Sequence, residues 1–189
     1  MQPDERREQI LDVAAAHFSQ IGYDGTSMSR IARDADITRA LVYHYFPNKD
    51  VLLDAVLRRE SAALLAATSP QPGLSVRSSL ERALAAYFSH FAASAGGLRN
   101  LYAPTAQSPA LVWEIAALNH EIQVDRLIAA TRQPDTPSLR LIFAAWLAFV
   151  ETAAQRAATD TGVISPEGFV RLCLDVFATS TGLDLDAPE

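Results

Sequence analysis

The segment from Thr26 to Leu53 most constrains the fold, because it reads as two short helices, a tight turn and the start of a further helix. In the first short helix, the apolar residues share one face at steps of three and four: Met28, Ile31, Ala32 and Ala35. Asp36 follows as the turn residue, since aspartate tolerates the left-handed conformation and bonds to its own backbone. In the second, the apolar residues again occupy one half of the helical wheel: Leu41, Val42, Tyr45 and Phe46. This spacing predicts a helix-turn-helix.

A longer helix is predicted before this segment. Its apolar residues recur at helical spacing: Ile10, Leu11, Ala14, Phe18 and Ile21. The sequence Gly-Tyr-Asp-Gly at residues 22–25 then ends the pattern, and Thr26 or Ser27 can cap the next helix. Because each of these helices has one apolar face, we expect the three to pack together.

The outward half of the second short helix carries an unusual set of side chains. Behind the N-cap Thr38, it presents a guanidinium, a methyl, a phenol and an imidazole, from Arg39, Ala40, Tyr43 and His44. Such groups suit DNA phosphates or base edges, although the pattern leaves open whether Tyr43 packs, His44 is a bystander or Arg39 touches only phosphate. The chain's only lysine, Lys49, follows in the first turn of the next helix, where the macrodipole disfavours a cation unless a phosphate lies nearby.

These residues resemble the signature of the TetR family of transcriptional regulators, with Thr38–Phe46 read as TRALVYHYF, followed by Lys49 and Leu52. The resemblance covers roughly residues 6 to 60. Asp36 and Ala40 depart from the family pattern, which usually has glycine at both positions. Asp36 bears on the fine angle of the turn, and Ala40 bears on how closely the second short helix approaches the DNA groove.

The resemblance implies a set of DNA-binding residues: Thr26, Ser27, Thr38, Arg39, Ala40, Tyr43, His44 and Lys49. Thr38 and Arg39 would lie at the major groove, while Tyr43, His44 and Lys49 would hold phosphates and Thr26 or Ser27 would clamp one more. The chemistry agrees, because arginine can make a bidentate contact to guanine and a methyl group such as that of Ala40 can lie against thymine.

The chain is acidic overall, with a formal net charge of −6, but its positive charge is concentrated where DNA contact is expected. The segment from Thr26 to Lys49 holds four basic and two acidic side chains, a net charge of +2. So small a basic patch supports few phosphate contacts. We therefore expect two such heads to act together.

The remainder of the chain also reads as helices. A proline- and glycine-containing break at residues 69–73 follows a helix that begins near Val51, and helical patterns then continue to the C-terminus without strand alternation. An all-α fold is predicted, with a helix-turn-helix DNA-binding domain at residues 1–50, its recognition motif at about 27–46, and a larger helical ligand-binding and dimerisation domain at residues 51–189.

The last two predicted helices need burial on more than one side. Residues 139–157 are apolar nearly all round over their first half, and a helix opened by Ser165-Pro166 repeats the apolar pattern. A second copy most simply supplies the missing side through a four-helix contact, with a large monomeric core as the alternative. The candidate dimerisation residues are Phe169, Leu172, Val176 and Phe177. Two-fold symmetry would then require an inverted-repeat operator in double-stranded DNA.

Aromatic residues gather between the predicted head and the dimerisation helices. Members of the TetR family usually bind a small molecule in this region, so the resemblance implies a hydrophobic or amphipathic effector. The candidate lining residues are Tyr87, Phe91, Tyr102, Trp113, Phe143, Trp146 and Phe149, although aromatics at this spacing also form plain cores. Glu151 either reaches the surface, pairs with an arginine such as Arg99 or Arg126, or meets a ligand; pairing is the expected outcome.

Other functional classes find little support in the sequence. No zinc-protease, nucleophile-elbow, P-loop or dinucleotide motif occurs, so we expect neither an enzyme nor a cofactor nor a metal. The longest apolar run, Leu141–Val150, is too short to span a bilayer and the first residues are polar, which favours a cytoplasmic protein without a membrane role. The lone Cys173 reads as a core residue. An architectural or cell-division factor on the same DNA-binding head would share every motif and stays open.

Overall fold

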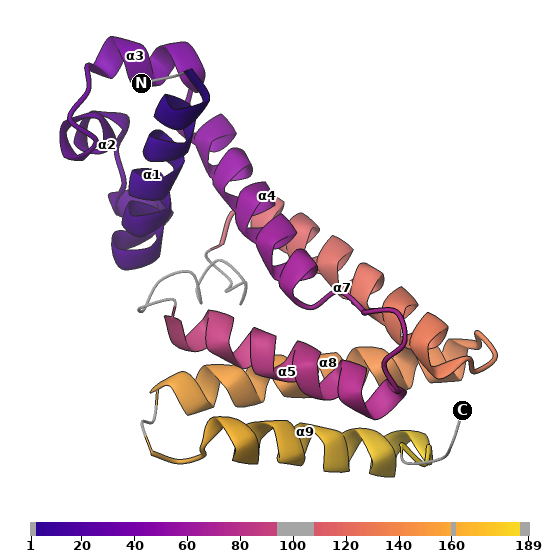
Figure 1. Ribbon diagram of the computed structural model, residues 1–189. Coiled ribbons are helices and arrows are strands. Elements are labelled where there is room, and N and C mark those ends of the chain that lie inside the picture. Colours follow the sequence, from indigo (N-terminus) through magenta and orange to yellow (C-terminus); the bar gives the residue numbers. More distant parts are fainter. Residues whose placement is uncertain (1–2, 94–107, 160–161, 186–189) are drawn as a thin grey trace. The chain divides into compact units, whose positions relative to one another are not determined.

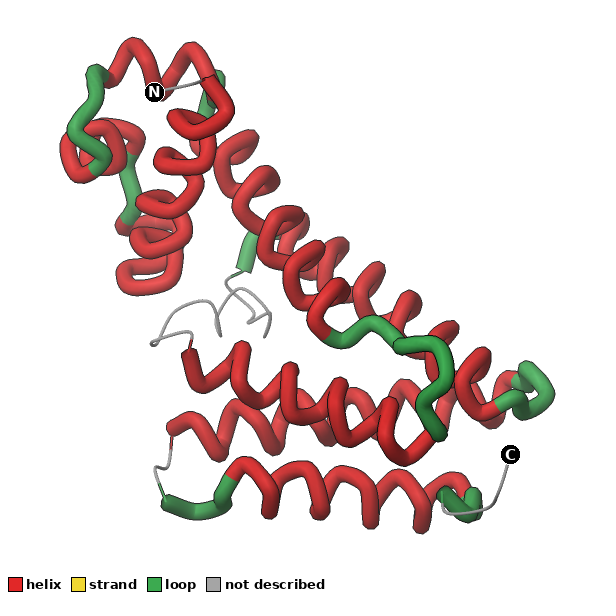
Figure 2. The backbone as a smooth tube through the Cα atoms, in the orientation of Figure 1, coloured by secondary structure: helices red, strands yellow, loops and turns green. Residues whose placement is uncertain are grey.

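Every element in the described part of the chain is an α-helix, which confirms the predicted all-α fold (Figures 1 and 2). A computed structural model describes residues 3–93, 108–159 and 162–185. The helices are α1 (Pro3–Gly25), α2 (Met28–Asp34), α3 (Arg39–Tyr45), α4 (Lys49–Ala67), α5 (Val76–Ala93), α7 (Ala110–Thr131), α8 (Pro137–Thr159) and α9 (Pro166–Thr181).

The packing divides the chain into two compact units. One contains the residues up to Ala62 together with the start of α7 as far as Ala116, and the other contains the rest of α4, α5, the rest of α7, α8 and α9. The division therefore falls inside α4, whereas the sequence suggested a functional boundary at residue 50. Both α4 and α7 contribute residues to each unit.

The first unit is built around one apolar core. The buried side chains from α1, α2, α3, α4 and the start of α7 include Ile10, Leu11, Phe18, Ile31, Val42, Phe46, Leu53, Val56, Val112 and Ile115. Asp36 adopts the left-handed conformation with φ of 51°, as predicted for the turn between α2 and α3. Gly22, with φ of 73°, interrupts the helical geometry of α1. The expected head of packed helices is thus confirmed.

Polar contacts tie α1 to its neighbours in this unit. From α4, Arg59 places Nη1 3.1 Å from a carboxylate oxygen of Glu8 and 2.8 Å from one of Asp12. From α1, the His17 Nε2 lies 2.8 Å from Asp34 at the end of α2. The Arg33 guanidinium and then His17 hold the pKa of the Asp34 carboxyl below its usual range. These contacts fix the orientation of α1 against the two helices.

The second unit is held together by aromatic contacts between α8 and α9. The Phe177 ring stacks on Phe143 at 5.6 Å between centroids and meets the edge of Trp146 at 4.8 Å. The Trp146 Nε1 donates to the Cys173 carbonyl at 2.9 Å, which satisfies the indole in the buried interior. The ring of Phe169, also on α9, lies 4.9 Å from the ring of Phe88 on α5, measured between centroids. The core of this unit therefore lies where α5, α8 and α9 meet.

This packing bears on the candidate dimerisation residues. Phe169 and Phe177 are fully buried within one copy, so they cannot themselves contact a second copy. Leu172 is 41% exposed and Val176 is half-buried. A stripe of apolar residues on a helix identifies the face that needs covering but does not distinguish cover by the same chain from cover by a partner. Here α5 and α8 of the same chain supply the cover for the two phenylalanines.

Helix α8 also leaves apolar surface uncovered. Residues 137–157 are long and apolar enough to cross a membrane, by length and composition alone, and α8 packs along α5 and α9. Only 22% of that stretch is buried inside the protein, and Leu141 is 70% exposed.

Candidate nucleic-acid interface

The outward face of α3 is the most distinctive surface of the first unit. Its inward face is anchored by Val42, which is 0% exposed, and by the buried ring of Phe46. The Thr38 hydroxyl caps the helix by accepting from the Leu41 backbone N–H at 3.2 Å. This anchoring leaves the predicted contact residues exposed together on the other face: Arg39, Ala40, Tyr43 and His44.

Two of these side chains are already arranged against each other. The Arg39 guanidinium lies 5.2 Å from the centre of the Tyr43 ring, and its Nη2 donates to the Tyr43 hydroxyl at 3.3 Å. His44 packs edge-on to Tyr45 at 5.5 Å between ring centroids. A cation, a phenol and an imidazole are thus presented side by side on an exposed helix face, which suits phosphate and base-edge contacts.

The hydroxyls of Thr26 and Ser27, which the sequence offered as alternative phosphate contacts, differ in burial and in hydrogen bonding. The Ser27 hydroxyl caps α2 by accepting from the Arg30 backbone N–H at 3.3 Å, is exposed, and keeps its own hydrogen to donate. Thr26 is 2% exposed, and its hydroxyl donates to the Gly22 carbonyl at 2.7 Å. Of the two, Ser27 is therefore the one with a hydroxyl free to reach a phosphate.

Lys49 is engaged within the protein. Its ammonium donates to the Tyr23 carbonyl at 2.8 Å and to the Thr26 carbonyl at 3.2 Å, and it lies 4.0 Å from the centre of the Tyr23 ring. The neighbouring Asp50 carboxylate accepts a hydrogen bond from the Tyr23 hydroxyl. That bond, followed by burial, raises the pKa of Tyr23 to about 12. Sequence reasoning missed Tyr23 and Asp50, and the only signal was an aromatic residue inside a glycine-flanked turn.

The candidate effector residues differ in burial within the described part of the chain, and Phe143 and Trp146 both contact Phe177. Phe143 and Trp146 are buried in the core contacts of α8 with α9, while Tyr87 and Phe149 are half-buried. Trp113 is 50% exposed and belongs to the first unit. The Phe91 side chain and Tyr102 lie outside the described residues.

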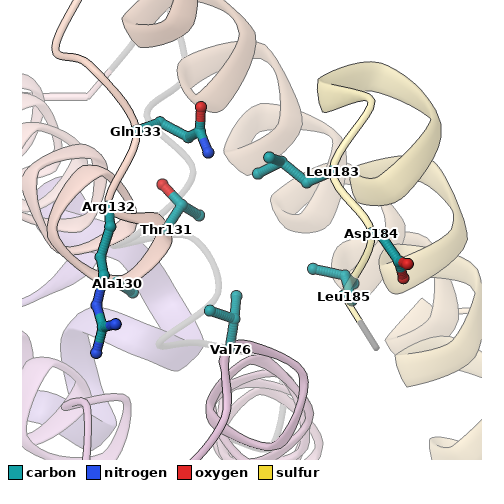
Figure 3. Close-up of a pocket in the computed structure, with 8 residues that line it drawn as sticks. All are labelled: Val76, Ala130, Thr131, Arg132, Gln133, Leu183, Asp184 and Leu185. Atoms are coloured by element: carbon teal, nitrogen blue, oxygen red, sulfur yellow. The ribbon is translucent and has the colours of Figure 1, made fainter. Parts of the chain in front are cut away.

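A pocket of about 320 Å³ occurs elsewhere in the second unit (Figure 3). It is lined where the start of α5, the end of α7 and the chain after α9 meet, by Val76, Ala130, Thr131, Arg132, Gln133, Leu183, Asp184 and Leu185. Figure 3 shows Val76, Leu183 and Leu185 pointing toward the same space. None of the seven aromatic residues expected to line an effector site belongs to this lining.

Among the described residues, Glu151 pairs with a histidine and not with Arg126. Its carboxylate lies 3.9 Å from the His120 Nδ1, while the His120 Nε2 lies 3.1 Å from the Ala144 carbonyl. Burial raises the pKa of Glu151, and the nearby His120 opposes that shift. Arg126, by contrast, donates to the Leu65 carbonyl and the Ser69 hydroxyl at the end of α4. Arg99 lies outside the described residues.

Comparison with known proteins shows which DNA-binding proteins the first unit resembles. Residues 10–56 match the family described as "Bacterial regulatory proteins, tetR family". The chain is 38% identical over 64 residues to the HTH-type transcriptional regulator BetI of Burkholderia thailandensis and 39% identical over 64 residues to BetI of Paraburkholderia phymatum. Each match covers 34% of this chain and 33% of the relative, so it spans only about a third of either protein.

Solved structures match over nearly the whole chain. A TetR-like transcriptional regulator from Rhodococcus sp. has a TM-score of 0.79 at 26% identity, covering 97% of this chain and 100% of the other. A TetR-family regulator from Streptomyces coelicolor has a TM-score of 0.82 at 26% identity, covering 97% and 85%. FadR from Bacillus subtilis, solved with stearoyl-CoA, shares the fold at 16% identity with a TM-score of 0.71, covering 94% and 99%.

The fold and the exposed α3 face thus define a helix-turn-helix protein with a C-terminal helical domain. Residues 10–56 match the helix-turn-helix region of the TetR family, as the signature around α3 indicated, and the fold over nearly the whole chain is similar to that of TetR-family regulators. Regulators of this family are not usually enzymes. Within the described residues, moreover, no three His, Cys, Asp or Glu side chains are grouped so as to hold a metal.

Proposed function

We propose that this protein is a sequence-specific DNA-binding regulator whose α3 enters the major groove. The observation that carries the proposal is the exposed set on α3, where Arg39 stacks on Tyr43 while the opposite face is locked into the core by Val42 and Phe46. A short helix fixed from behind can present side chains to base edges with little loss of conformational entropy on binding. In this arrangement Arg39 reads a base, while Ser27, Tyr43 and His44 contact phosphates.

The working unit in this proposal is a dimer formed through α8 and α9. Leu141 on α8 and Leu172 on α9 are exposed, and the small residues Ala145 and Ala148 continue the exposed side of α8 at helical spacing. A surface of leucine and alanine on two adjacent helices suits close helix packing against the same surface of a second copy. Two-fold symmetry then makes the operator an inverted repeat.

The regulatory part of the proposal is a repressor released by a small hydrophobic or amphipathic effector. Support comes from the shared fold with FadR of Bacillus subtilis, which was solved with stearoyl-CoA, and from the half-buried Tyr87, Phe149 and His120–Glu151 pair in the second unit. An effector that favours a different separation of the two heads weakens operator binding, and about 1.4 kcal/mol of coupling gives a tenfold change. We place the protein in the cytoplasm, where its DNA is.

Selection of bound fragments from genomic DNA tests this function. We expect a small number of tightly bound fragments that share an inverted repeat, with binding weakened when hydrophobic or amphipathic compounds are added. A protein that coats many unrelated fragments with similar affinity would instead be the architectural factor that the sequence left open. Failure to enrich any fragment would overturn the proposal.

A further inference from the structure

The C-terminal end of α4 is closed by side chains, some of which come from two other helices. The last four carbonyls of an α-helix have no partner within the helix, and in α4 they belong to residues 64–67. The Thr68 hydroxyl donates to the Leu64 carbonyl at 2.9 Å, and the Ser69 hydroxyl donates to the Leu65 carbonyl at 2.7 Å. Further donors come from α5 and α7.

Two arginines supply these further donors. From α5, Arg82 donates through Nη1 to the Ala67 carbonyl at 3.4 Å and through Nη2 to the Ser69 carbonyl. From α7, Arg126 donates through Nη1 to the Leu65 carbonyl at 2.9 Å and through Nη2 to the Ser69 hydroxyl at 3.2 Å. The two guanidinium groups therefore meet at Ser69. We refer to Arg82, Arg126 and Ser69 as the α4 clasp.

A second contact between α7 and the end of α4 lies beside the clasp. The Gln123 side-chain amide donates to the Thr68 hydroxyl at 2.8 Å, and Thr68 is buried. Gln123 and Arg126 are three residues apart, so they lie on the same face of α7. This face of α7 is therefore bonded to the end of α4 at two successive positions.

The clasp arginines face a helix end and no carboxylate. Within the part of the chain that the structure describes, neither guanidinium lies within ion-pair distance of an aspartate or a glutamate. Burial lowers the pKa of Arg126. Because the C-terminal end of a helix carries a partial negative charge that attracts a cation, both guanidinium groups are stabilised by the end of α4. Their stabilisation depends on that end staying in place.

The end of α9 shows the alternative, which is a cap made by the local backbone. Gly182 follows α9 in the left-handed conformation, with φ of 70°, and its backbone N–H donates to the Ala178 carbonyl at 2.9 Å. Neither Thr68 nor Ser69, the residues that follow α4, adopts that conformation. The end of α4 therefore depends in part on α5 and α7, whereas the backbone of α9 closes its own end.

The other end of α4 belongs to the first unit. Leu53 and Val56 are buried in the core of that unit, and Arg59 bonds to two carboxylates of α1. Residues 63–67, at the end of the same helix, belong to the second unit. Because α4 is one helix, a hold on its end also restricts the head that contains its start.

We propose that Arg82 and Arg126 are positioning residues for operator binding, which hold the last carbonyls of α4 in the second unit and so limit the spacings that the two heads of a dimer adopt. This inference rests on the proposed function, because it concerns two heads on one inverted repeat. A dimer whose heads are held at the operator spacing binds the second half-site as an intramolecular step, at a high effective concentration. A loosened α4 lowers that effective concentration.

Amide hydrogen exchange of the full chain without DNA tests the clasp itself. Peptides that cover residues 64–69 are compared by mass spectrometry between the wild type and Arg126→Met. Because hydrogen bonds from a charged donor are the stronger ones, their loss should make this segment exchange at least about tenfold faster. Arg77→Met is the matched control, since Arg77 is an arginine of α5 that pairs with Glu81 and lies outside the clasp. Unchanged exchange in Arg126→Met would overturn the proposal.

Binding to one half-site and to the complete inverted repeat tests the positioning role. Both DNAs derive from a fragment recovered in the genomic selection. A single half-site engages one head, so the wild type and Arg126→Met should bind it with affinities that agree within about twofold. The affinity of Arg126→Met for the complete repeat should fall at least about tenfold, because the second head is no longer held at the operator spacing.

Two further measurements distinguish a positioning role from a general structural defect. Operators with base pairs inserted between the half-sites should be discriminated strongly by the wild type and weakly by Arg126→Met. Arg126→Lys, which keeps a charged donor for the Leu65 carbonyl, should recover part of the lost affinity for the complete repeat. Analytical ultracentrifugation should find a dimer in every variant. A monomeric Arg126→Met would assign the loss to the interface and would overturn the proposal.

The remaining outcomes separate this inference from the proposed function. An equal fall in affinity for the half-site and the repeat would mean that the head itself is disturbed, and an unchanged ratio of the two affinities would mean that the clasp does not set the spacing; either result overturns the proposal. If Arg126→Met fails to fold, Arg82→Met removes the donors of α5 and is held to the same outcomes. A protein that selects no DNA fragment would reject the proposed function and the positioning role together, while hydrogen exchange would still decide whether the clasp holds the end of α4.

Discussion

The Arg39 guanidinium lies over the ring of Tyr43, one helical turn further along α3, and donates to the hydroxyl of the same residue. This contact restricts an otherwise free arginine side chain on an exposed surface. In the proposed function, fewer side-chain conformations must therefore be given up when the pair binds DNA. The phenol also sets the direction in which the guanidinium fork points, which matters for a bidentate contact to guanine.

Substitutions at these two positions should have different effects on sequence preference. Arg39→Ala should cost about 1–3 kcal/mol at one base pair of each half-site and relax the preference there. Tyr43→Ala should weaken binding to all sequences, whereas Tyr43→Phe, which keeps the ring under Arg39, should retain most of the preference. Competition binding with operators changed at single base pairs measures both effects. Unchanged binding in Arg39→Ala and Tyr43→Ala would place DNA on another surface.

The local features of the head follow from the sequence because they depend on near neighbours. The caps Ser27 and Thr38 each accept a hydrogen bond from a backbone N–H three residues ahead. Asp36 adopts the left-handed conformation, which its residue type tolerates. The Lys49 contacts join residues 23 and 26 positions apart, and helical periodicity carries no information about such pairs. For this reason the motif was predicted correctly, while the contacts of Tyr23 and the bond from the Thr26 hydroxyl to the Gly22 carbonyl were not.

A similar limit explains the second unit. The sequence predicted the apolar stripe of α9 and its start at Ser165 and Pro166. Its partner was not, because an intramolecular and an intermolecular neighbour require the same side chains. Phe177 proves to be a core residue covered by Phe143 and Trp146, whereas Leu172 faces outward. The contact of Glu151 with His120, 31 residues away, was likewise not visible in the sequence.

Removal of the central aromatic side chain of the second unit should destabilise the protein strongly. Phe177 is fully buried between two aromatic partners, and Phe→Ala substitutions at such sites cost about 3–5 kcal/mol through lost burial and a cavity. Thr179→Ala, at an exposed position two residues further along α9, is the control and should change stability by less than about 0.5 kcal/mol. Urea unfolding followed by circular dichroism gives both values. Equal stability of the two variants would contradict the packing described.

Charged residues on the exposed sides of α8 and α9 should produce monomers. Leu141→Glu and Leu172→Glu place a carboxylate where the proposed partner copy packs, and burying an unpaired charge is strongly unfavourable. Leu118→Glu is the matched control, because Leu118 on α7 is a leucine whose exposure lies between those of Leu141 and Leu172. Analytical ultracentrifugation should show a dimer for the wild type and the control. Dimers that persist in both α8 and α9 variants would reject these helices as the interface.

The single thiol should be inert in the folded protein. Cys173 is buried in α9, and burial raises the pKa of its thiol to about 12, so almost no thiolate is present at pH 8. Reaction with Ellman's reagent should be at least about 100-fold slower in the native protein than in urea. The Phe177→Ala variant, in which a neighbouring core contact is lost, should react faster than the wild type. A rapid native reaction would show that this part of α9 is open to solvent.

The bond between Tyr23 and Asp50 should make the stability of the head sensitive to alkaline pH. The pKa of Tyr23 is raised from 10.0 to about 12 in the folded chain, first by that bond, so the folded state holds the phenolic proton more tightly than the unfolded state does. Its contribution to stability is therefore complete below pH 10 and is lost as the pH rises from 10 to 12.

The comparison that isolates this contribution is between the wild type and Tyr23→Phe, since all other alkaline titrations are common to both chains. The difference in urea midpoint between them should be constant below pH 10 and should shrink between pH 10 and 12. Tyrosinate absorbance of the folded proteins gives an independent check, because the phenol that the variant lacks should ionise last in the wild type. A midpoint difference that stays constant through pH 12 would mean that the bond to Asp50 does not hold the Tyr23 proton more tightly in the folded chain than in the unfolded chain.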